Sequence, residues 1–386
     1  MIKMESRRHH FIDWLRVLAV LLLLPFHTSR VFNADDPFYV KSDELSTPIS
    51  YVLSFVDAWH MPLLFFLAGA STFFAFRKRT RREYLTERVR RLMVPLLFGV
   101  LVLVPPQTWY GGRFNSEYTG SYVHYLASRD FLVMNIRDGG DYYGGLGIGH
   151  LWFILVLLVV AVAMTPLVGP GGRRASRWQR LSNVVSQPAG WLLAGGAIFV
   201  AEGLPDVFGK NPFYYLVFFA LGYAAMSSEH FMETAQQHRW PALLGGGAVV
   251  IWWVASWRFR TSLPDPSVGL AAINLLGMTG RWLVIVGLVG VARRHLDRPS
   301  RRLAYLAEAS YPIYIIHQTV IVVLAYYIVQ ITVTWPLQWL LLLGGAVVGT
   351  FLAYEGVRRI DWLRIAFGMR PMPSPAHPKT QKAQRA

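Results

Sequence analysis

Four histidines stand inside or beside long apolar segments of this sequence, where an imidazole is an uncommon side chain. His27 lies in the first apolar segment, and His60, His150 and His317 lie in or beside three later ones. A histidine deep in a bilayer costs free energy unless it faces protein or water. Each of the last three, taken singly, fits a hydrogen-bonded structural role. Together the four indicate a polar interior cavity, in which His27 is the candidate for a catalytic or transport role.

Asp13, Arg16 and His27 share one face of the first expected helix. At 100° per residue, Arg16 and His27 point within about 20° of each other, and Asp13 lies about 40° to the other side of His27. At a rise of 1.5 Å per residue, Arg16 and His27 are roughly 16 Å apart along the axis. Asp13 and Arg16 have an alternative explanation as an interfacial ion pair that reaches toward water. His27 lies too deep for that explanation.

The later histidines are accompanied by aromatic residues. Tyr314 and His317 are three residues apart and share a helical face. His60 lies about ten residues into the second apolar segment, and His150 stands two residues before Trp152 at the start of the fourth. No His-x-x-x-His or Glu-x-x-His spacing links the histidines, so we expect no metal site. The sequence has no cysteine, which excludes disulfides, cysteine nucleophiles and thiolate metal sites.

Eight cationic side chains crowd the fifteen residues 77–91. Such a run can bind the phosphates of a cytosolic ligand, but it also serves as a topology signal and attracts anionic lipid. We favour the second explanation for the first half of the run. Arg88 and Arg91 differ, because they lie one turn apart at the start of an expected helix, where a pocket could hold them.

The elements that must position these residues are membrane helices. Hydrophobic residues make up 54% of the 386 residues, and the mean hydropathy is +0.35. A run of 18 or more apolar residues can cross the roughly 30 Å of a bilayer core. We therefore expect an all-α, polytopic integral membrane protein with about ten transmembrane helices. The expected spans are 11–33, 50–76, 89–109, 150–168, 188–203, 211–226, 239–256, 268–292, 308–330 and 336–355.

The distribution of cationic residues sets the expected orientation. Of the 38 Lys and Arg residues, 28 fall on one side of the ten spans and 7 on the other. Cytoplasmic loops collect Lys and Arg, so both termini are expected in the cytoplasm. The same rule accounts for the net charge of +16 without a nucleic-acid partner.

The chain is expected to form a single membrane-embedded domain over residues 1–369, followed by a disordered cytoplasmic tail over 370–386. The first 30 residues imitate a signal peptide, but charges within the apolar segment and the lack of a small-x-small site favour a retained helix. The longest outer loop, 110–149, is rich in Gly and Tyr. Its tyrosines suit either stacking on sugar rings or an interfacial aromatic belt.

Five pieces of the sequence, in order, resemble motifs of the acyltransferase 3 family of membrane O-acyltransferases. They are Asp13-Trp14-Leu15-Arg16 followed by His27; the run Met61-Pro62-Leu63-Leu64-Phe65-Phe66-Leu67-Ala68-Gly69; Arg88 and Arg91 before Pro95; His150-Leu151-Trp152-Phe153; and Ser310-Tyr311-x-x-Tyr314-x-x-His317. The branch most similar to this sequence contains glucan-modifying succinyltransferases of the cell envelope. The sequence departs from many family members at Ala68-Gly69-Ala70, where they have Ser-Gly-Phe.

The resemblance implies an enzyme of the cytoplasmic (inner) membrane with no permanently bound cofactor. It implies that an acyl-CoA binds from the cytoplasm and that its acyl group, acetyl or succinyl, reaches a hydroxyl of an envelope glycan or glycolipid on the outer side. His27 would act as general base or as nucleophile. The resemblance also implies roles for the other candidates. Arg16 and Asp13 would order the helix-one face, and Arg88 and Arg91 would pair with CoA phosphates. His317 with Tyr314 would orient or stabilise the oxyanion. The candidates for the substrate side are His60, His150 and Trp152.

Two other classes of protein fit part of the pattern. A secondary transporter with a histidine proton relay usually shows inverted repeats and carboxylates at mid-depth, and this sequence shows no such repeat. A non-catalytic membrane scaffold leaves the deep histidines without an explanation. The acyl group, the acceptor, the choice between base and nucleophile, and the oligomeric state stay open from the sequence.

Overall fold

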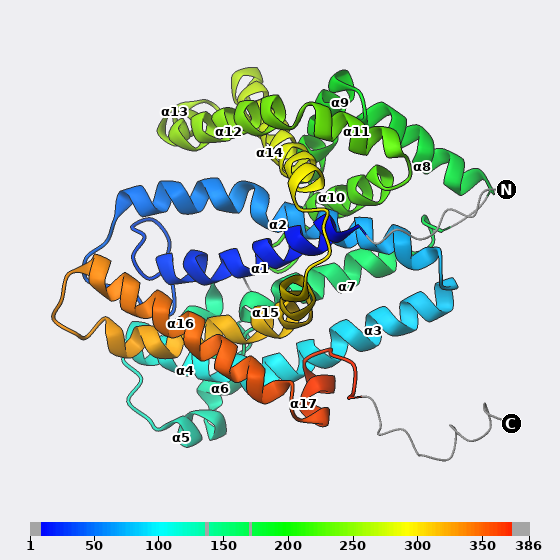
Figure 1. Ribbon diagram of the computed structural model, residues 1–386. Coiled ribbons are helices and arrows are strands. Elements are labelled where there is room, and N and C mark those ends of the chain that lie inside the picture. Colours follow the sequence, from blue (N-terminus) through cyan, green and yellow to red (C-terminus); the bar gives the residue numbers. More distant parts are fainter. Residues whose placement is uncertain (1–8, 136–138, 170–171, 373–386) are drawn as a thin grey trace, which may run out of the picture.

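Long apolar helices make up the body of the protein (Figure 1). The structure is a computed structural model that describes residues 9–135, 139–169 and 172–372, and every named element in these ranges is helical. Six helical stretches are long and apolar enough to cross a membrane, and a seventh is reached if a bent pair is one span. The six are α1 (His10–Ser29), α2 (Thr47–Phe76), the run Arg81–Asn115, α14 (Val268–His295), α15 (Arg301–Ile328) and α16 (Trp335–Val357).

The run Arg81–Asn115 is built from three elements that follow one another directly. They are α3 (Arg81–Phe98), a π-helical segment (Gly99–Leu103) and α4 (Val104–Asn115). A capping box starts the run: the Thr80 side chain accepts from the Glu83 amide, and the Glu83 side chain accepts from the Thr80 amide.

The bent pair consists of Ala175–Val185 in α8 (Gly172–Val185) and of α9 (Pro188–Glu202). The chain bends by 109° between these two helices. Three shorter helices also follow the apolar pattern: α7 (Trp152–Met164), α10 (Pro212–Ala225) and α12 (Arg239–Ala255). A helix therefore lies in each of the ten ranges expected from the sequence. The structure establishes a multi-pass, all-helical membrane protein within the described residues, and the number of ten spans stays a prediction.

Segments expected to be loops are partly helical. The expected outer loop 110–149 begins as the end of α4, and it contains α5 (Tyr122–Ala127), α6 (Arg129–Leu132) and a 3₁₀ turn at Gly140–Tyr143. The remaining short helices are α11 (Glu229–Gln237), α13 (Trp257–Ser262) and α17 (Asp361–Ala366). The expected disordered tail lies almost entirely outside the described residues, which end at residue 372.

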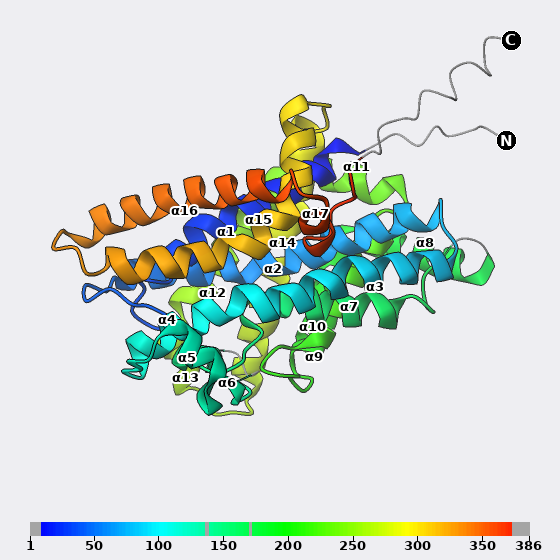
Figure 2. The same ribbon diagram turned by 90° about the horizontal axis from the view of Figure 1, so that it is seen from below.

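Helix α1 lies at the centre of the bundle. It packs against α2 and α15, and α16 and α14 also contact it. Figures 1 and 2 show the α1–α2 and α15–α16 connections at one end of the bundle and the α2–α3 connection at the other. Any side chain on α1 that points inward therefore meets residues of α2 and α15.

Glycines allow α2 and α10 to cross at very close range. A Cβ added at Gly69 of α2 would overlap the carbonyl oxygen of Phe219 on α10. A Cβ added at Gly222 of α10 would overlap the carbonyl oxygen of Phe66 on α2. Small residues serve this purpose in membrane helix pairs, where close backbone packing replaces the hydrophobic driving force available in water.

Candidate functional site

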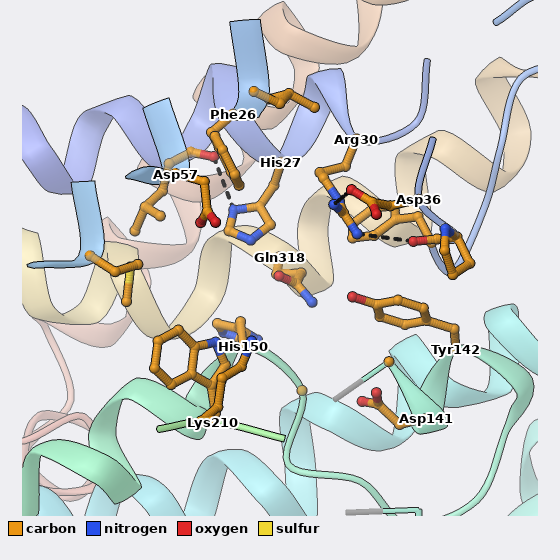
Figure 3. Close-up of a pocket in the computed structure, with 18 of the residues that line it drawn as sticks. Phe26, His27, Arg30, Asp36, Asp57, Asp141, Tyr142, His150, Lys210 and Gln318 are labelled. Carbon is orange, nitrogen blue, oxygen red and sulfur yellow. Dashed lines mark hydrogen bonds and ion pairs between the residues drawn. The ribbon is translucent and has the colours of Figure 1, made fainter. Parts of the chain in front are cut away.

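A cavity of about 470 Å³ lies beside the C-terminal half of α1, and we call it the histidine cavity. Its wall combines aromatic rings with a small number of charged and polar groups, as small-molecule sites do. The residues considered below that line it are Phe26, His27, Arg30, Asp36, Phe38, Asp57, His60, Asp141, Tyr142, His150, Trp152, Lys210, Tyr314 and Gln318. Figure 3 shows side chains from several helices and loops projecting toward this space.

His27 and His317 form a hydrogen-bonded pair between α1 and α15. Nε2 of His317 lies 3.2 Å from Nδ1 of His27, and the ring centroids are 4.9 Å apart. Nδ1 of His317 lies 2.7 Å from the carbonyl oxygen of Tyr314, and Nδ1 of His27 lies 3.2 Å from that of Leu23. A carbonyl oxygen only accepts, so both Nδ1 atoms must carry the proton.

One protonation pattern of the neutral rings satisfies all three contacts. Nδ1 of His317 donates to Tyr314, which leaves Nε2 of His317 as an acceptor for the Nδ1 proton of His27. The remaining nitrogen of His27, Nε2, is then unprotonated. Because His27 lines the histidine cavity, this lone pair is available to a ligand there.

His150 and His60 are held by backbone carbonyls. Nε2 of His150 lies 3.0 Å from the carbonyl oxygen of Ile315, and its ring centroid lies 5.1 Å from that of His317. Nε2 of His60 lies 2.6 Å from the carbonyl oxygen of Ala19, which ties α2 to α1. Both line the cavity, as predicted, but each already donates one ring proton to the protein.

Trp152 and Lys210 cover one side of the cavity. The Lys210 ammonium lies 4.6 Å from the centroid of the Trp152 ring, a cation–π distance. Both line the histidine cavity, and the substrate-side role of Trp152 stays a prediction.

The loop between α1 and α2 forms another wall of the histidine cavity, and hydrogen bonds from Lys41 stabilise this loop. Nζ of Lys41 donates to the carbonyl oxygens of Arg30, Asn33 and Asp36. Burial and the nearby Arg30 charge lower the pKa of Lys41 to about 8. Arg30 in turn pairs with Asp36 at 2.8 Å, so this wall carries a nearly neutral ion pair.

A second cavity of about 320 Å³ lies nearer the cation-rich end of the bundle, and we call it the arginine cavity. Four arginines and one glutamate line it together with apolar side chains and tyrosines. The lining includes Arg16, Arg79, Arg88 and Arg91 with Glu87, the apolar residues Val20, Leu64, Ala68, Phe153 and Leu157, and the tyrosines Tyr84, Tyr311 and Tyr314.

Tyr314 is a shared wall of the two cavities. Its hydroxyl donates to the carbonyl oxygen of His150, and its own carbonyl oxygen accepts from His317. The predicted pair Tyr314 and His317 is therefore together in space, at the boundary between the two cavities.

Arg16 and Arg88 are oriented toward the arginine cavity by neutral hydroxyls. Arg16 donates to Oγ of Ser71 at 2.6 Å and pairs with Asp13 at 3.3 Å. Arg88 donates to the hydroxyls of Tyr84 and Thr72, each at 3.2 Å. Hydroxyls orient the Arg88 guanidinium without neutralising it, so this charge can still attract an anion.

The predicted residues thus divide between two places. Arg16, Arg88 and Arg91 line the arginine cavity, whereas His27, His60, His150 and Trp152 line the histidine cavity. Asp13 lies at neither; it pairs with Arg16 near the N-terminal end of α1 and lines a neighbouring groove. The described residues contain no group of three or more His, Asp and Glu placed to hold a metal ion.

Reading the sequence alone missed several residues of the histidine cavity, among them Asp57, Asp141 and Gln318. Asp57 carried a usable signal, because it lies three residues before His60 and so shares a helical face with it. Asp141 gave none, because an irregular loop places it.

Comparison with known proteins shows the family of this chain. A family model described as an acyltransferase domain matches residues 9–355. The chain is 23% identical over 384 residues to glucans biosynthesis protein C of Shigella dysenteriae serotype 1, covering 95% of this chain and 96% of that protein. It is 23% identical over 388 residues to the protein of the same name from Escherichia coli strain K12, with the same coverage. No solved structure matches the chain.

Proposed function

The chain belongs to the acyltransferase domain family and is an acyl-transferring membrane enzyme, and from this premise we propose its donor, its acceptor and its mechanism. The donor is a cytosolic acyl-CoA that carries an acetyl or succinyl group. The acceptor is a hydroxyl of an envelope glycan or glycolipid on the outer side of the cytoplasmic membrane. The transporter considered from the sequence is not retained, because the family transfers acyl groups.

The observation that carries the proposal is the meeting of two cavities of different chemistry at Tyr314. The arginine cavity offers cations of the kind that pair with phosphates. The histidine cavity offers an unprotonated imidazole nitrogen among aromatic rings. A thioester held at the boundary would have its acyl carbonyl near His27 and its nucleotide toward the arginines.

In the general-base route, Nε2 of His27 takes the proton of the acceptor hydroxyl while the acceptor oxygen attacks the thioester carbonyl. The C–S bond then breaks, and the imidazolium returns the proton to the departing thiolate, so that CoA leaves as the thiol. In the nucleophile route, the same Nε2 attacks the carbonyl, the C–S bond breaks and CoA leaves as the thiolate, so that the acyl group is held on Nε2. The acceptor oxygen then attacks this acyl group, the C–N bond breaks, and the hydroxyl proton passes to the thiolate. Both routes need the tautomer described above.

His317 acts as a positioning residue in this mechanism. Both of its ring nitrogens are engaged, one by Tyr314 and one by His27, so it has no free proton for an oxyanion. Its acceptor nitrogen holds the His27 proton on Nδ1 and stabilises the charge that develops on His27 during transfer. The geometry therefore favours the orienting role over direct oxyanion stabilisation.

The name of the relatives supports a glucan as the acceptor. Proteins called glucans biosynthesis protein C align with nearly the whole of this chain. The aromatic rings of the histidine cavity suit such an acceptor, since sugar rings stack on aromatic side chains. We therefore take a glucose polymer as the first acceptor to test.

The test uses the purified full chain in nanodiscs with radiolabelled acetyl-CoA and succinyl-CoA, each with and without a glucan oligosaccharide. Wild type is compared with His27→Ala and with His124→Ala, which removes an exposed histidine on α5. We expect label in the glucan from wild type and His124→Ala, and at least a 100-fold lower rate from His27→Ala. Undiminished turnover in folded His27→Ala would refute the assignment of His27.

A further inference from the structure

Three carboxylates line the histidine cavity, and two of them are already engaged. Asp36 is paired with Arg30 at 2.8 Å, and Asp141 accepts a hydrogen bond from the hydroxyl of Tyr39. Asp57 differs, since it forms no hydrogen bond or ion pair with any residue that the structure describes, and its side chain is exposed to the cavity. A cavity that holds one free carboxylate has an acceptor ready for a ligand's donors.

The helix that carries Asp57 is fixed relative to the helix that carries His27. One turn further along α2, His60 binds the carbonyl oxygen of Ala19 on α1. At 1.5 Å per residue, Asp57 lies about 4.5 Å outward of His60, and His27 lies about 12 Å outward of Ala19. Asp57 and His27 are therefore offset by roughly 7 Å along the bundle, which is a distance that one sugar unit can span. Figure 3 shows both side chains projecting into the same space.

The charges around Asp57 favour hydroxyl groups over a cationic ligand. Lys210 lines the same cavity, and Arg281 lies within electrostatic range of Asp57 while its guanidinium donates to the hydroxyl of Tyr214. These cations would repel an amine or an ammonium group. An ionised carboxylate accepts hydrogen bonds from two donors at once.

We propose that Asp57 is a binding residue for the acceptor: its carboxylate accepts hydrogen bonds from two neighbouring hydroxyls of one sugar unit and presents a further hydroxyl to Nε2 of His27. The ligand class is a neutral carbohydrate with vicinal hydroxyls, seated between the aromatic rings of Phe38, Tyr142 and Trp152. The cavity volume of about 470 Å³ lies within the roughly 300–1,000 Å³ of small-molecule sites. This inference rests on the proposed acyl transfer to a glycan.

The first measurement is binding, without turnover. Wild type, Asp57→Asn and Asp43→Asn are titrated in nanodiscs with glucose hexasaccharides of differing linkage, followed by calorimetry. Asp43 lies in the loop that precedes α2, is exposed and does not line the cavity, so its variant is the control for loss of an aspartate charge. We expect at least one hexasaccharide to bind wild type and Asp43→Asn equally and Asp57→Asn about tenfold more weakly, because a neutral amide accepts a weaker hydrogen bond.

The second measurement compares two fates of the acyl group. With acetyl-CoA and succinyl-CoA as donors, the ratio of transfer to glycan over hydrolysis by water is expected to fall about tenfold in Asp57→Asn, because water needs no vicinal-diol site. An unchanged ratio, or equal hexasaccharide affinity in wild type and Asp57→Asn, would overturn the role of Asp57. The role of Asp57 would also be overturned if the wild-type protein bound no hexasaccharide, even if the protein still cleaved thioesters in a His27-dependent way. If hexasaccharide binding depended on Asp57 but no thioester cleavage were observed, the proposed function would be refuted and the Asp57-dependent glycan site would stand.

Discussion

Replacing His317 by alanine removes the one side chain that holds the proton of His27 on Nδ1. In the resting state, the Nδ1 proton of His27 then has only the carbonyl oxygen of Leu23 as a partner, at 3.2 Å. During transfer, His27 becomes positively charged and loses a charge-assisted hydrogen bond to Nε2 of His317. The variant is therefore predicted to slow the chemical step more than it weakens binding.

The size of the effect follows from the difference between the two states. A neutral hydrogen bond contributes about 1 kcal/mol, and one to a charged group contributes about 1.5–3 kcal/mol. Only the difference, about 0.5–2 kcal/mol, raises the barrier, which corresponds to a roughly 2- to 30-fold lower kcat. The loss of His27 itself removes the proton acceptor, for which about 10²- to 10⁴-fold is typical.

The assay measures transfer of label from acyl-CoA to glucan at saturating concentrations of both substrates. His317→Gln is the informative companion, because its amide oxygen can accept from Nδ1 of His27 and its amide nitrogen can donate to the carbonyl of Tyr314. We expect this variant to recover much of the kcat that His317→Ala loses, with similar KM values in all three proteins. A purely structural role would lower the melting temperature of both variants and would give no such recovery.

Two results would refute the reasoning. An unchanged kcat in folded His317→Ala would mean that the pair with His27 contributes nothing to the chemical step. A loss in His317→Ala as large as in His27→Ala, with no recovery in His317→Gln, would make His317 a residue that acts on the substrate itself.

Three further predictions concern other parts of the protein. Arg88→Ala is expected to raise the KM for acyl-CoA about tenfold through loss of a charge-assisted contact. Arg82→Ala, on an exposed part of the same helix, is expected to leave this KM unchanged. Equal KM values for the two variants would contradict the role of the arginine cavity. Gly69→Ala is expected to destabilise the fold by about 1–3 kcal/mol, because its Cβ overlaps α10. Gly245→Ala is the control, because the space around Gly245 is open, and its melting temperature should change little. Similar melting temperatures for the two variants would show that the α2–α10 crossing tolerates a methyl group. The pKa of Lys41 is about 8 in the folded protein against 10.5 ordinarily, so between these pH values the unfolded state binds more protons than the folded state. The free energy of unfolding therefore rises with pH across this window, by about 1 kcal/mol after solvent screening. Lys41→Met should lose this rise in melting curves at pH 7.5 and 10, and an identical pH dependence of both proteins would contradict the prediction.

The sequence by itself determined the class of protein and the content of single helices. Apolar runs long enough to cross a bilayer predicted an all-helical, multi-pass membrane protein, because hydrocarbon accepts only backbones whose hydrogen bonds are satisfied internally. Helical periodicity also placed Tyr314 and His317 on one face, and the structure finds them joined. The order of short motifs predicted the acyltransferase family, which the family match confirms.

Relations between helices were decided by the tertiary structure alone. Spacing along α1 places Arg16 and His27 on one face, but it does not show that they line two separate cavities with Tyr314 as a shared wall. The contact between His27 and His317 joins residues 290 positions apart, and the freedom of Asp57 depends on what neighbouring helices leave unpaired. Periodicity constrains directions within one rigid helix, whereas the rotation and depth of one helix against another follow from close packing, such as the glycine contact of α2 with α10.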